Sequence, residues 1–397
     1  MAEPNTRRAV PAGEAPEPTV EQAPGVWHIG SYEAARQVLQ ARGGTTQAGF
    51  TSEFVPKGLL KHHPILFSDG SLHDEQRRKV GRFFAPRVVA ERYQPLMVDA
   101  AERLLADAVA ERGALVEDLA LLYSVDVTRQ VVGLTDSPVE GLAGRLVRFF
   151  NQPPFDITKP DLGRTRRQWA AAAVNGLGPL LRFYLADVRP AIRERRRRPA
   201  EDVISHLIAE GYTDADILVE CVTYGTAGMV TTREFIAMAL WHLLTDADLR
   251  AAYRDGDAEA RIAVLEELIR LEPVVGHLYR RIQEPLAVTD GERRWQLEPG
   301  DLVDVRVRQT NVDPAAIGPD PASLCPARPL ARGVHAAGLS FGDGAHRCPG
   351  QALALRETEV LLTRLLPLDP TILSEPRIEW DDLVAGYCLR DFRVRLG

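Results

Sequence analysis

A ten-residue stretch near the C-terminus constrains this chain more than any other feature: Phe-Gly-Asp-Gly-Ala-His-Arg-Cys-Pro-Gly, residues 341–350. It places Cys348 at the end of a glycine-rich loop, directly before a segment from Gln351 onward that has a helical pattern. Backbone N–H groups at a helix N-terminus favour negative charge, so they help a thiolate to stay ionised. Three glycines allow tight turns and let a flat ligand lie close to the backbone, namely Gly342, Gly344 and Gly350.

A lone cysteine is more often a small buried hydrophobic side chain or an ordinary thiol. Here, however, the spacing Phe-Gly-x-Gly-x-His-x-Cys-x-Gly resembles the haem-binding loop of the cytochrome P450 family. The resemblance implies that the chain binds haem b, with Cys348 as the axial sulfur ligand that donates electron density to iron. Phe341 is then expected to pack beside the haem, and His346 to meet its anionic groups.

The composition is that of an ordinary globular protein: 397 residues, of which 45% are hydrophobic and 26% charged. The net charge of −7 argues against nucleic acid as a partner. The four cysteines have no C-x-x-C spacing, which excludes a disulfide scaffold and indicates a reducing compartment. There is no apolar run of membrane-spanning length, so we expect a cytoplasmic protein with no membrane partner.

The first 22 residues lack an apolar signal-peptide core and are rich in Pro, Glu and Ala, so we expect a disordered leader over residues 1–22. Helical spacing dominates the rest of the chain, with short β-rich pieces at 286–307 and in the C-terminal tail. We see no repeat and no clear linker. We therefore expect a mainly α fold with small β-sheets, forming one domain over residues 23–397, and a monomer. The resemblance implies the same P450 fold.

The most apolar helix is expected over residues 215–244, with Asp214 as its cap. A helix that is apolar on nearly all sides is buried, so we place it at the centre of the fold. The resemblance to the P450 family implies that this helix lies above the haem. Residues 42–70 and 151–165 have no periodicity and are expected to be long loops that contact substrate. A short strand is expected at 27–30, and further helices at 32–41, 88–111, 166–198, 258–272 and from 351 to about 366.

Glu267 and Arg270 lie three residues apart, which by itself is typical of a surface ion pair. The segment resembles the Glu-x-x-Arg helix of the P450 family, in which a buried ion pair fixes the region of the cysteine loop. The family often adds a third residue in a Pro-x-Arg-Phe segment. This sequence departs from that pattern, and Arg328 is the candidate substitute.

Residues 69–78 resemble the family's Asp-x-x-x-His-x-x-x-Arg-Arg helix, which implies that His73 and Arg77 hold the haem propionates. A basic surface helix is the alternative. Arg280 resembles the arginine of the family's Arg-x-x-x-Glu strand, which also meets a propionate, with Arg281 as the fallback. The family often has a histidine where this chain has Gly338. That contact is then missing or is supplied by one of two other histidines, His346 or His335.

The apolar helix contains Ala227-Gly228-Met-Val-Thr231, which resembles the family's Ala-Gly-x-acid-Thr motif over the iron. Gly228 is expected to leave room for dioxygen and Thr231 to offer it a hydroxyl, although a threonine in a buried helix often bonds back to a carbonyl instead. The family's acid, which relays protons, is Val230 here. A weak relay favours substrate-assisted proton delivery or radical coupling, and the sequence resembles the enzymes that couple tryptophan-containing diketopiperazines.

Pro349 follows the cysteine and has no N–H, so one donor to the Cys348 sulfur is absent. Fewer hydrogen bonds make a thiolate more electron-donating and lower the iron potential.

Electrons are expected from NAD(P)H through a reductase and an acidic ferredoxin or flavodoxin, because no flavin or iron–sulfur module is encoded. The partner is expected to dock on a basic patch on the cysteine side, formed by Arg77, Arg78, Lys79, Arg82 and Arg347. The expected substrate contacts are Tyr224, Val230, Val275, Gly276 and Leu389. Aromatic residues before and within the 166–198 helix suggest an aromatic substrate, although they also suit helix packing: Phe149, Phe150, Phe155 and Trp169.

Two other functions compete with a haem-thiolate oxidoreductase. A non-catalytic haem sensor or carrier is one, because the acid of the relay is missing. A cysteine hydrolase using Cys348 and His346 is the other, but two residues on one tight loop are poorly placed for a base to reach the sulfur.

Overall fold

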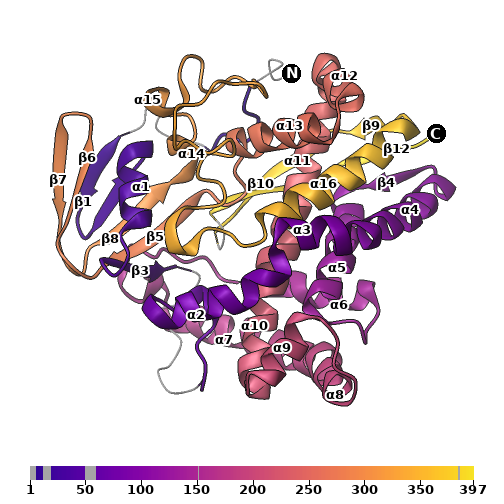
Figure 1. Ribbon diagram of the computed structural model, residues 1–397, viewed down its shortest axis with the longest axis horizontal. Helices are drawn as coiled ribbons and strands as arrows, with labels where there is room; N and C mark the ends of the chain where they lie inside the picture. Colours follow the sequence, from indigo (N-terminus) through magenta and orange to yellow (C-terminus); the bar gives the residue numbers. More distant parts are fainter. Residues whose placement is uncertain (1–5, 12–18, 50–59, 151, 383–384) are drawn as a thin grey trace.

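The structure is a computed structural model that describes residues 6–11, 19–49, 60–150, 152–382 and 385–397. Helices make up most of the molecule, and the largest sheet forms one side of it (Figure 1). The expected mainly α architecture with small sheets is confirmed. Within the described residues, no helix is both long enough and apolar enough to cross a membrane.

The α-helices of the described residues are grouped by their place in the chain, before the central helix or from its start onward. The first group is α1 (Tyr32–Gln40), α2 (Gly70–Gly81), α3 (Pro86–Val88), α4 (Gln94–Ala110), α5 (Val116–Val132), α6 (Val139–Val147), α7 (Arg166–Phe183), α8 (Arg189–Arg197) and α9 (Val203–Ala209). The second is α10 (Asp214–Gly225), α11 (Thr231–Thr245), α12 (Ala247–Asp255), α13 (Ala258–Leu271), α14 (Val307–Thr310), α15 (Pro314–Ile317) and α16 (Gln351–Leu365). The helices expected at 166–198 and 215–244 are each interrupted by a wider π-helical turn, η7 (Tyr184–Val188) and η8 (Thr226–Val230).

The central helix runs from α10 through η8 to α11 and packs against α5 and α16. From Thr232 to Leu243 its residues are buried, as the sequence predicted. Its cap was assigned wrongly. Thr213, not Asp214, is the N-cap, because the Thr213 hydroxyl accepts the N–H of Asp216 while the Asp216 carboxylate accepts the N–H of Thr213.

Four small sheets complete the fold. The largest has the strand order β1-β2-β8-β5-β3, formed by Val20–Ala23, Val26–Ile29, Leu302–Arg306, His277–Ile282 and Thr45–Ala48. The others are the hairpin β6 (Leu286–Asp290) with β7 (Arg293–Leu297), the pair β10 (Arg377–Asp381) and β11 (Gly386–Arg390), and the sheet β4 (Gly113–Leu115), β12 (Arg393–Arg395) and β9 (Thr371–Ser374).

A buried carboxylate joins three strands of the largest sheet. Asp304 on β8 accepts hydrogen bonds from His28 on β2 at 2.9 Å and from His277 on β5 at 2.6 Å. Burial opposes ionisation, but these two bonds outweigh it and lower the pKa of Asp304 to about 2. Asp304 therefore links β8 to β2 and to β5, the strand that carries Arg280, through side-chain hydrogen bonds.

The expected leader is wrong for the part of residues 1–22 that the structure describes. Ala9 is fully buried, and the guanidinium of Arg7 donates to the carbonyl of Leu271 at 2.7 Å. The backbone N–H of Arg8 donates to the buried carboxylate of Glu272. Residues 20–22 belong to strand β1. The composition of this segment could not indicate these contacts, because they depend on residues far away in the sequence. Residues 1–5 and 12–18 lie outside the described residues.

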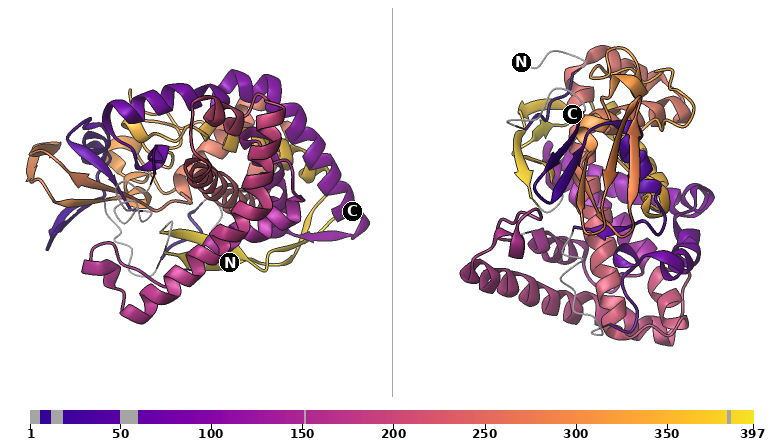
Figure 2. Two further views of the ribbon diagram at one scale, coloured as in Figure 1. Left: turned by 90° about the horizontal axis from the view of Figure 1, so that it is seen from below. Right: turned by 90° about the vertical axis from the view of Figure 1, so that its left-hand side faces the viewer.

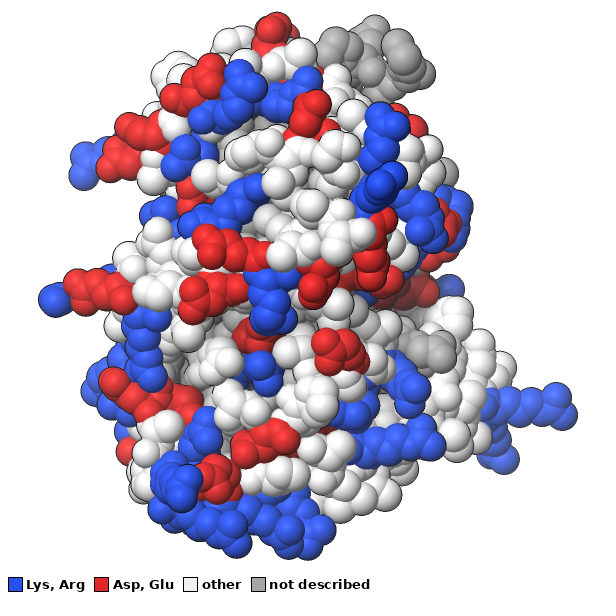
Figure 3. Space-filling view, turned by 90° about the vertical axis from the view of Figure 1, so that its right-hand side faces the viewer, with Lys and Arg blue, Asp and Glu red and all other residues white. Residues whose placement is uncertain are grey.

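The arginine-rich end of α8 is exposed beyond Arg195, which pairs with Asp202. Figure 3 shows acidic and basic side chains interspersed over the face that it presents, with cations gathered at its lower edge, the end of the molecule that holds α8.

Candidate active site

The cysteine loop holds Cys348 at the start of α16. The backbone N–H of Cys348 donates to the carbonyl of Phe341 at 2.8 Å, which closes the loop. The Cys348 sulfur accepts the N–H groups of Gly350 and Gln351, the first residues at the helix N-terminus. The cysteine side chain is exposed, although α16 itself is largely buried. The loop thus places an exposed cysteine side chain directly before the N-terminus of a helix.

The side chain of Asp343 fixes this loop to α1. Its carboxylate accepts hydrogen bonds from Arg36 at 2.7 Å, Gln40 at 2.9 Å and the N–H of Gly344 at 2.8 Å. Burial raises the pKa of Asp343, but these bonds more than compensate and lower it below its usual value. Gly344 has φ +66°, and a Cβ there would lie 2.1 Å from the carbonyl oxygen of Leu39, so only glycine fits.

Three of the expected propionate ligands lie in one cluster. The rings of His73 and His346 stack with their centroids 4.1 Å apart, and His346 bonds to Asp69 at 2.9 Å. Arg280 donates to Gln47 at 2.6 Å and interacts electrostatically with Asp69. Burial lowers the pKa of Arg280 to about 10, and burial together with His346 and Arg77 lowers that of His73 to about 4. The sequence patterns from three distant segments therefore meet.

Arg77 connects this cluster to the sulfur. It donates to the carbonyl of Arg347, next to the cysteine. Burial lowers the pKa of Arg77, while the nearby Cys348 and Tyr224 act in the opposite direction. Arg77 thus lies within electrostatic reach of both the cysteine loop and α10. Arg281, the fallback for Arg280, bonds instead to the carbonyl of Gly300.

The missing histidine at Gly338 has a steric cause. A Cβ on Gly338, which has φ +57°, would lie 2.3 Å from the Oδ1 atom of Asn311. That amide is fully engaged, because it accepts the N–H of Leu339 and donates to Arg270 and Ser340. His335 lies 3.7 Å from Asp343 on the same stretch, so His346 is the histidine that joins the cluster.

Glu267 and Arg270 form a buried ion pair with two bonds, of 2.7 and 2.6 Å. Arg270 has no exposed surface and also donates to the carbonyls of Asn311 and Pro321. The third member is Arg328, whose Nε lies 3.4 Å from Glu267. The pair therefore anchors the irregular stretch that leads into the cysteine loop.

On the central helix, η8 brings two hydroxyls back onto the backbone. Thr231 donates to the carbonyl of Ala227 at 2.5 Å, and Thr232 donates to that of Gly228 at 2.7 Å. Ala227 is exposed in the middle of this otherwise buried helix. A Cβ on Gly228 would lie 3.5 Å from the Thr128 side chain of α5, an ordinary van der Waals contact, and the room that the glycine leaves for dioxygen stays a prediction.

Four of the five expected substrate contacts are buried, and their contact with substrate stays a prediction. Leu389 is fully buried and its N–H donates to Glu234. A Cβ on Gly276 would lie 2.1 Å from the carbonyl of Ala385. Phe149, one of the aromatic residues, packs edge-on against Phe183 in the core. Two more are largely enclosed, namely Tyr224, whose ring stacks on that of Phe84, and Val230. Of the five, Val275 keeps the most exposed surface.

A contact that sequence reasoning missed lies between residues 60–67 and α10. Asp216 accepts the N–H of Lys61 at 3.1 Å and bonds to the His62 ring at 3.0 Å. Glu220 accepts the N–H of Ile65 at 2.8 Å, and burial raises its pKa to about 7. Two acids one turn apart on an apolar helix were the available signal. Residues 50–59 of the expected loop lie outside the described residues.

These residues fit a haem-thiolate centre. An exposed thiol at the start of a buried helix suits a metal ligand, and the gathered guanidinium and imidazole donors suit two carboxylates. Within the described part of the chain, no cluster of three or more His, Cys, Asp or Glu side chains offers an alternative metal site.

Known proteins resemble this chain in sequence over most of its length. Residues 262–367, which include the ion pair and the cysteine loop, match the cytochrome P450 family model. The chain is 30% identical over 361 residues to nocardicin C N-oxygenase of Nocardia uniformis subsp. tsuyamanensis, covering 87% of this chain and 82% of that protein. The chain belongs to the cytochrome P450 family. It is also 28% identical to erythromycin C-12 hydroxylase of Saccharopolyspora erythraea, covering 88% of this chain and 83% of that protein.

Solved P450 structures share the fold over nearly the whole chain. P450BioI in complex with an acyl carrier protein ligated to hexadec-9Z-enoic acid superposes with a TM-score of 0.77 at 20% identity, covering 96% of each chain. Mycobacterium smegmatis CYP164A2 gives 0.74 at 26% identity, covering 94% of this chain and 92% of that one. The protein is thus a cytochrome P450 monooxygenase, and its family implies haem as cofactor.

We expect Glu267→Gln to lower the free energy of unfolding by about 3–5 kcal/mol, because it leaves the buried Arg270 without its counter-charge. Urea denaturation of the purified holoprotein measures this. Glu91→Gln, in the exposed pair with Arg87, is the matched control and should change stability by less than about 0.5 kcal/mol. Equal, small effects of both substitutions would contradict the anchoring role.

Proposed function

We propose that this enzyme oxidises a small, aromatic natural product by hydroxylation or by oxidative C–C or C–N coupling, with tryptophan-containing diketopiperazines as first candidates. The observation that carries the proposal is Val230, an apolar residue at the position of the family's usual acid. Among its relatives are proteins named for reactions on nocardicin C and erythromycin, which supports a natural-product substrate. Phe155 and Trp169, both near the guanidinium of Arg164, support an aromatic one.

Haem, when bound, supplies the activation of dioxygen. We assign Cys348 as its iron ligand, supported by the two N–H groups at the start of α16 that stabilise the sulfur's charge. We assign His73, Arg77 and Arg280 to its propionates, with His346 in the same cluster. Phe341, Gly342 and Gly350 complete the cofactor-binding loop in this assignment.

The residues on the central helix hold few mobile protons. The Thr231 hydroxyl donates its proton in a hydrogen bond to the carbonyl of Ala227. Val230 has no polar group that could pass a proton from water to Thr231. Protons at Thr231 must therefore come through water or from the substrate itself. A substrate that carries its own N–H or O–H near the site of oxidation meets this need, as an indole or cyclic amide does.

We propose that electrons come from NAD(P)H through a reductase and an acidic ferredoxin or flavodoxin in the cytoplasm. The docking patch is smaller than the sequence suggested. Lys79 is neutralised by Glu75 and Glu210, and Arg77 is partly buried toward the sulfur. Arg78 and Arg82 remain exposed and are the better candidates for steering.

A haem sensor or carrier is the alternative function, because it also needs no proton relay. A cysteine hydrolase is less well supported, because the Cys348 sulfur accepts the N–H groups of Gly350 and Gln351, while the His346 ring contacts Asp69 and His73. We further propose a single haem-thiolate domain that includes residues 6–11, which pack on the same body as residues 23–397.

A tryptophan-containing cyclic dipeptide should shift the ferric spin state on binding and accelerate NADPH consumption, with formation of an oxidised product, when a surrogate ferredoxin and its reductase are supplied. Optical titration and product analysis measure the two effects. A cyclic dipeptide without an aromatic side chain is the control ligand. Binding without product would favour the sensor or carrier, and a lack of binding by every aromatic candidate would refute the proposed substrate class.

We expect Pro349→Leu to raise the iron reduction potential, on the order of tens of millivolts, because it restores an N–H beside the Cys348 sulfur. Redox titration measures the shift. Pro349→Ala adds the same N–H with a smaller side chain, so it should give a similar increase. An unchanged or lower potential in both variants would disprove the hydrogen-bond argument.

A further inference from the structure

The N-terminal half of the central helix carries polar groups that its packing leaves partly unused. Glu220 on α10 is 2% exposed, and Tyr224, one turn later, is 8% exposed. The Oε1 atom of Glu220 accepts the N–H of Ile65 at 2.8 Å, but its Oε2 atom and the Tyr224 hydroxyl form no hydrogen bond of ordinary geometry within the described part of the chain. Figure 2 shows the helix that holds them crossing the molecule, lengthwise in one view and end-on in the other.

The carboxyl group and the phenol are neighbours that affect one another. Burial raises the pKa of Glu220 to about 7, although the Ile65 N–H and the Tyr224 hydroxyl act in the opposite direction. Burial also raises the pKa of Tyr224, and Glu220 adds to that effect. An acid and a phenol thus lie close together inside the protein, each with hydrogen-bonding capacity to spare.

Gln76 on α2 adds a third polar group of this kind. Its amide nitrogen donates to the carbonyl of His63 at 2.7 Å and to the Tyr212 hydroxyl at 3.3 Å, while its Oε1 atom is buried without a partner among the described residues. Tyr212 lies within electrostatic reach of both Glu220 and Tyr224. Buried polar atoms without protein partners are the places where proteins hold internal water. Between them, α2 and α10 thus enclose a site suited to water.

Tyr224 connects these groups to the candidate active site. Its hydroxyl acts on the pKa of Arg77, the same guanidinium on which Cys348 acts. Nearly one turn further along the helix, Ala227 is exposed, and the Thr231 hydroxyl donates to the carbonyl of Ala227 at 2.5 Å. The Thr231 oxygen can still accept a hydrogen bond there. The helix is therefore open to water between the phenol and the Thr231 hydroxyl.

We propose that Glu220 stores a proton for this enzyme and that the Tyr224 hydroxyl passes it on toward Thr231. Water that reaches the exposed helix face at Ala227 completes the path. Glu220 gives up the proton of its carboxyl group, Tyr224 accepts one proton and releases another, and solvent protonates Glu220 again between turnovers. The helix thus keeps an acid about three turns before the position where Val230 replaces the family's acid.

The demand for protons comes from the family's reaction. Monooxygenation consumes two electrons and two protons for each dioxygen, because one oxygen atom enters the substrate and the other leaves as water. The electrons come from the redox partner, and the proposed store supplies protons close to the site. The proposal rests on this monooxygenase chemistry and not on the proposed substrate class.

The protonation state of Glu220 decides when the store is filled. Because its pKa is raised to about 7, the carboxyl group is protonated below that pH and ionised above it. Asp216, one turn earlier, adds negative charge and acts in the same direction as burial. The titratable or charged groups around Glu220 and Tyr224 are Asp216, Cys221, Tyr212, Lys61, His62, Arg77 and Lys79. The relay should therefore weaken as the pH rises through 7.

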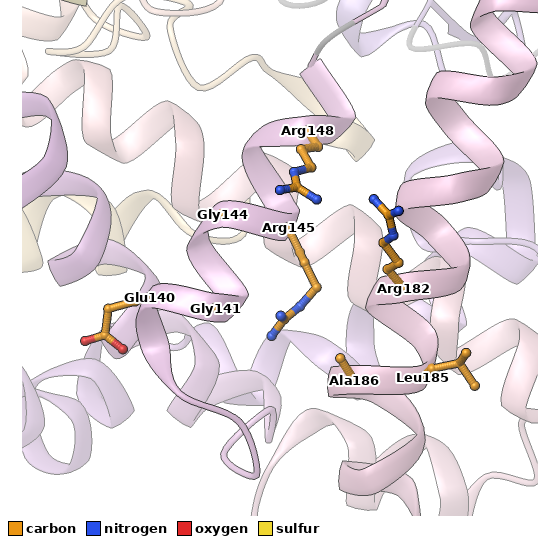
Figure 4. Close-up of a pocket in the computed structure, with 8 residues that line it drawn as sticks. All are labelled: Glu140, Gly141, Gly144, Arg145, Arg148, Arg182, Leu185 and Ala186. Atoms are coloured by element: carbon orange, nitrogen blue, oxygen red, sulfur yellow. The ribbon is translucent and has the colours of Figure 1, made fainter.

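The arginines of α6 and α7 do not compensate the charge of Glu220. They line an open groove of about 600 Å³ between these helices, and Figure 4 shows Arg148 and Arg182 pointing toward one another across it. Arg145 is paired with Asp187 through bonds of 2.5 and 2.6 Å. None of the three acts on the pKa of Glu220. Without a cation as partner, the protonated form of the buried acid is favoured.

Infrared difference spectroscopy of the ferric holoprotein tests the store without turnover. The wild type should show the C=O band of a protonated carboxylic acid that shifts in D₂O and disappears as the pH rises through 7. Glu220→Gln keeps an oxygen that can accept the Ile65 N–H, and it should lack this band. Glu357 should give a second band that does not change in this range, because burial raises its pKa well above its ordinary value.

Glu117→Gln is the matched control and should keep the titrating band. Glu117 is also buried, accepts the backbone N–H of Asp391 at 2.6 Å and has an Oε2 atom without a partner in the described chain, but it lies at the start of α5. A wild type without the titrating band, or a Glu220→Gln variant that keeps it, would overturn the proposed store.

NADPH oxidation by the substrate-free holoprotein, with a surrogate ferredoxin and its reductase, tests the relay. Dioxygen that takes up two electrons and two protons leaves as hydrogen peroxide, whereas dioxygen that takes up one electron and no proton leaves as superoxide. Glu220→Gln and Tyr224→Phe should each raise the superoxide share about threefold or more. The wild type should approach that share above pH 7, and Glu117→Gln should behave like the wild type.

An unchanged haem spectrum and melting temperature confirm that each variant is folded. Equal superoxide shares in all four proteins, or an effect of Glu220→Gln without one of Tyr224→Phe, would overturn the relay. A holoprotein that takes no electrons from the surrogate would instead refute the proposed electron supply, and the infrared experiment would then decide the proposal about Glu220.

Discussion

The position of the Cys348 sulfur is the constraint on which the rest of the site depends. Two N–H groups at the start of α16 point at it, and the loop that carries it is closed by its own backbone and fixed to α1 through Asp343. These N–H groups favour the thiolate, but desolvation by the surrounding chain outweighs them and raises the pKa of Cys348 above its ordinary value. A bound metal ion would be needed to hold the sulfur in its ionised form. The propionate cluster, the central helix and the redox surface have a common function only if this sulfur binds iron.

Buried charges hold the elements around that sulfur in place. Arg270 and Glu267 join α13 to the irregular stretch before the loop, with Arg328 as third member. Asp304 cross-links the sheet that carries Arg280. Removing one partner of such a pair leaves a buried charge, which costs far more than a surface pair contributes. Much of the rigidity of this site therefore comes from polar groups in the core.

Sequence reasoning succeeded where a local pattern carries its own physical cause. The apolar run of the central helix and the glycine-rich loop before α16 are such patterns. It did not reach the contacts that tertiary packing decides. The Gly276 contact with Ala385, the burial of Leu389 and the docking of Arg7 depend on segments far away in the sequence. The cap at Thr213 was missed because its partner, Asp216, was not weighed. At Gly338 the structure explains a departure from the family pattern, because a side chain there would collide with Asn311.

The absorption spectrum of the reduced protein under carbon monoxide tests the central claim most directly. Thiolate ligation by Cys348 predicts a strongly red-shifted Soret band in the wild type that is lost in Cys348→Ala. A wild type that binds haem without this band, or a Cys348→Ala variant that keeps it, would contradict the assignment of the iron ligand and with it the proposed chemistry.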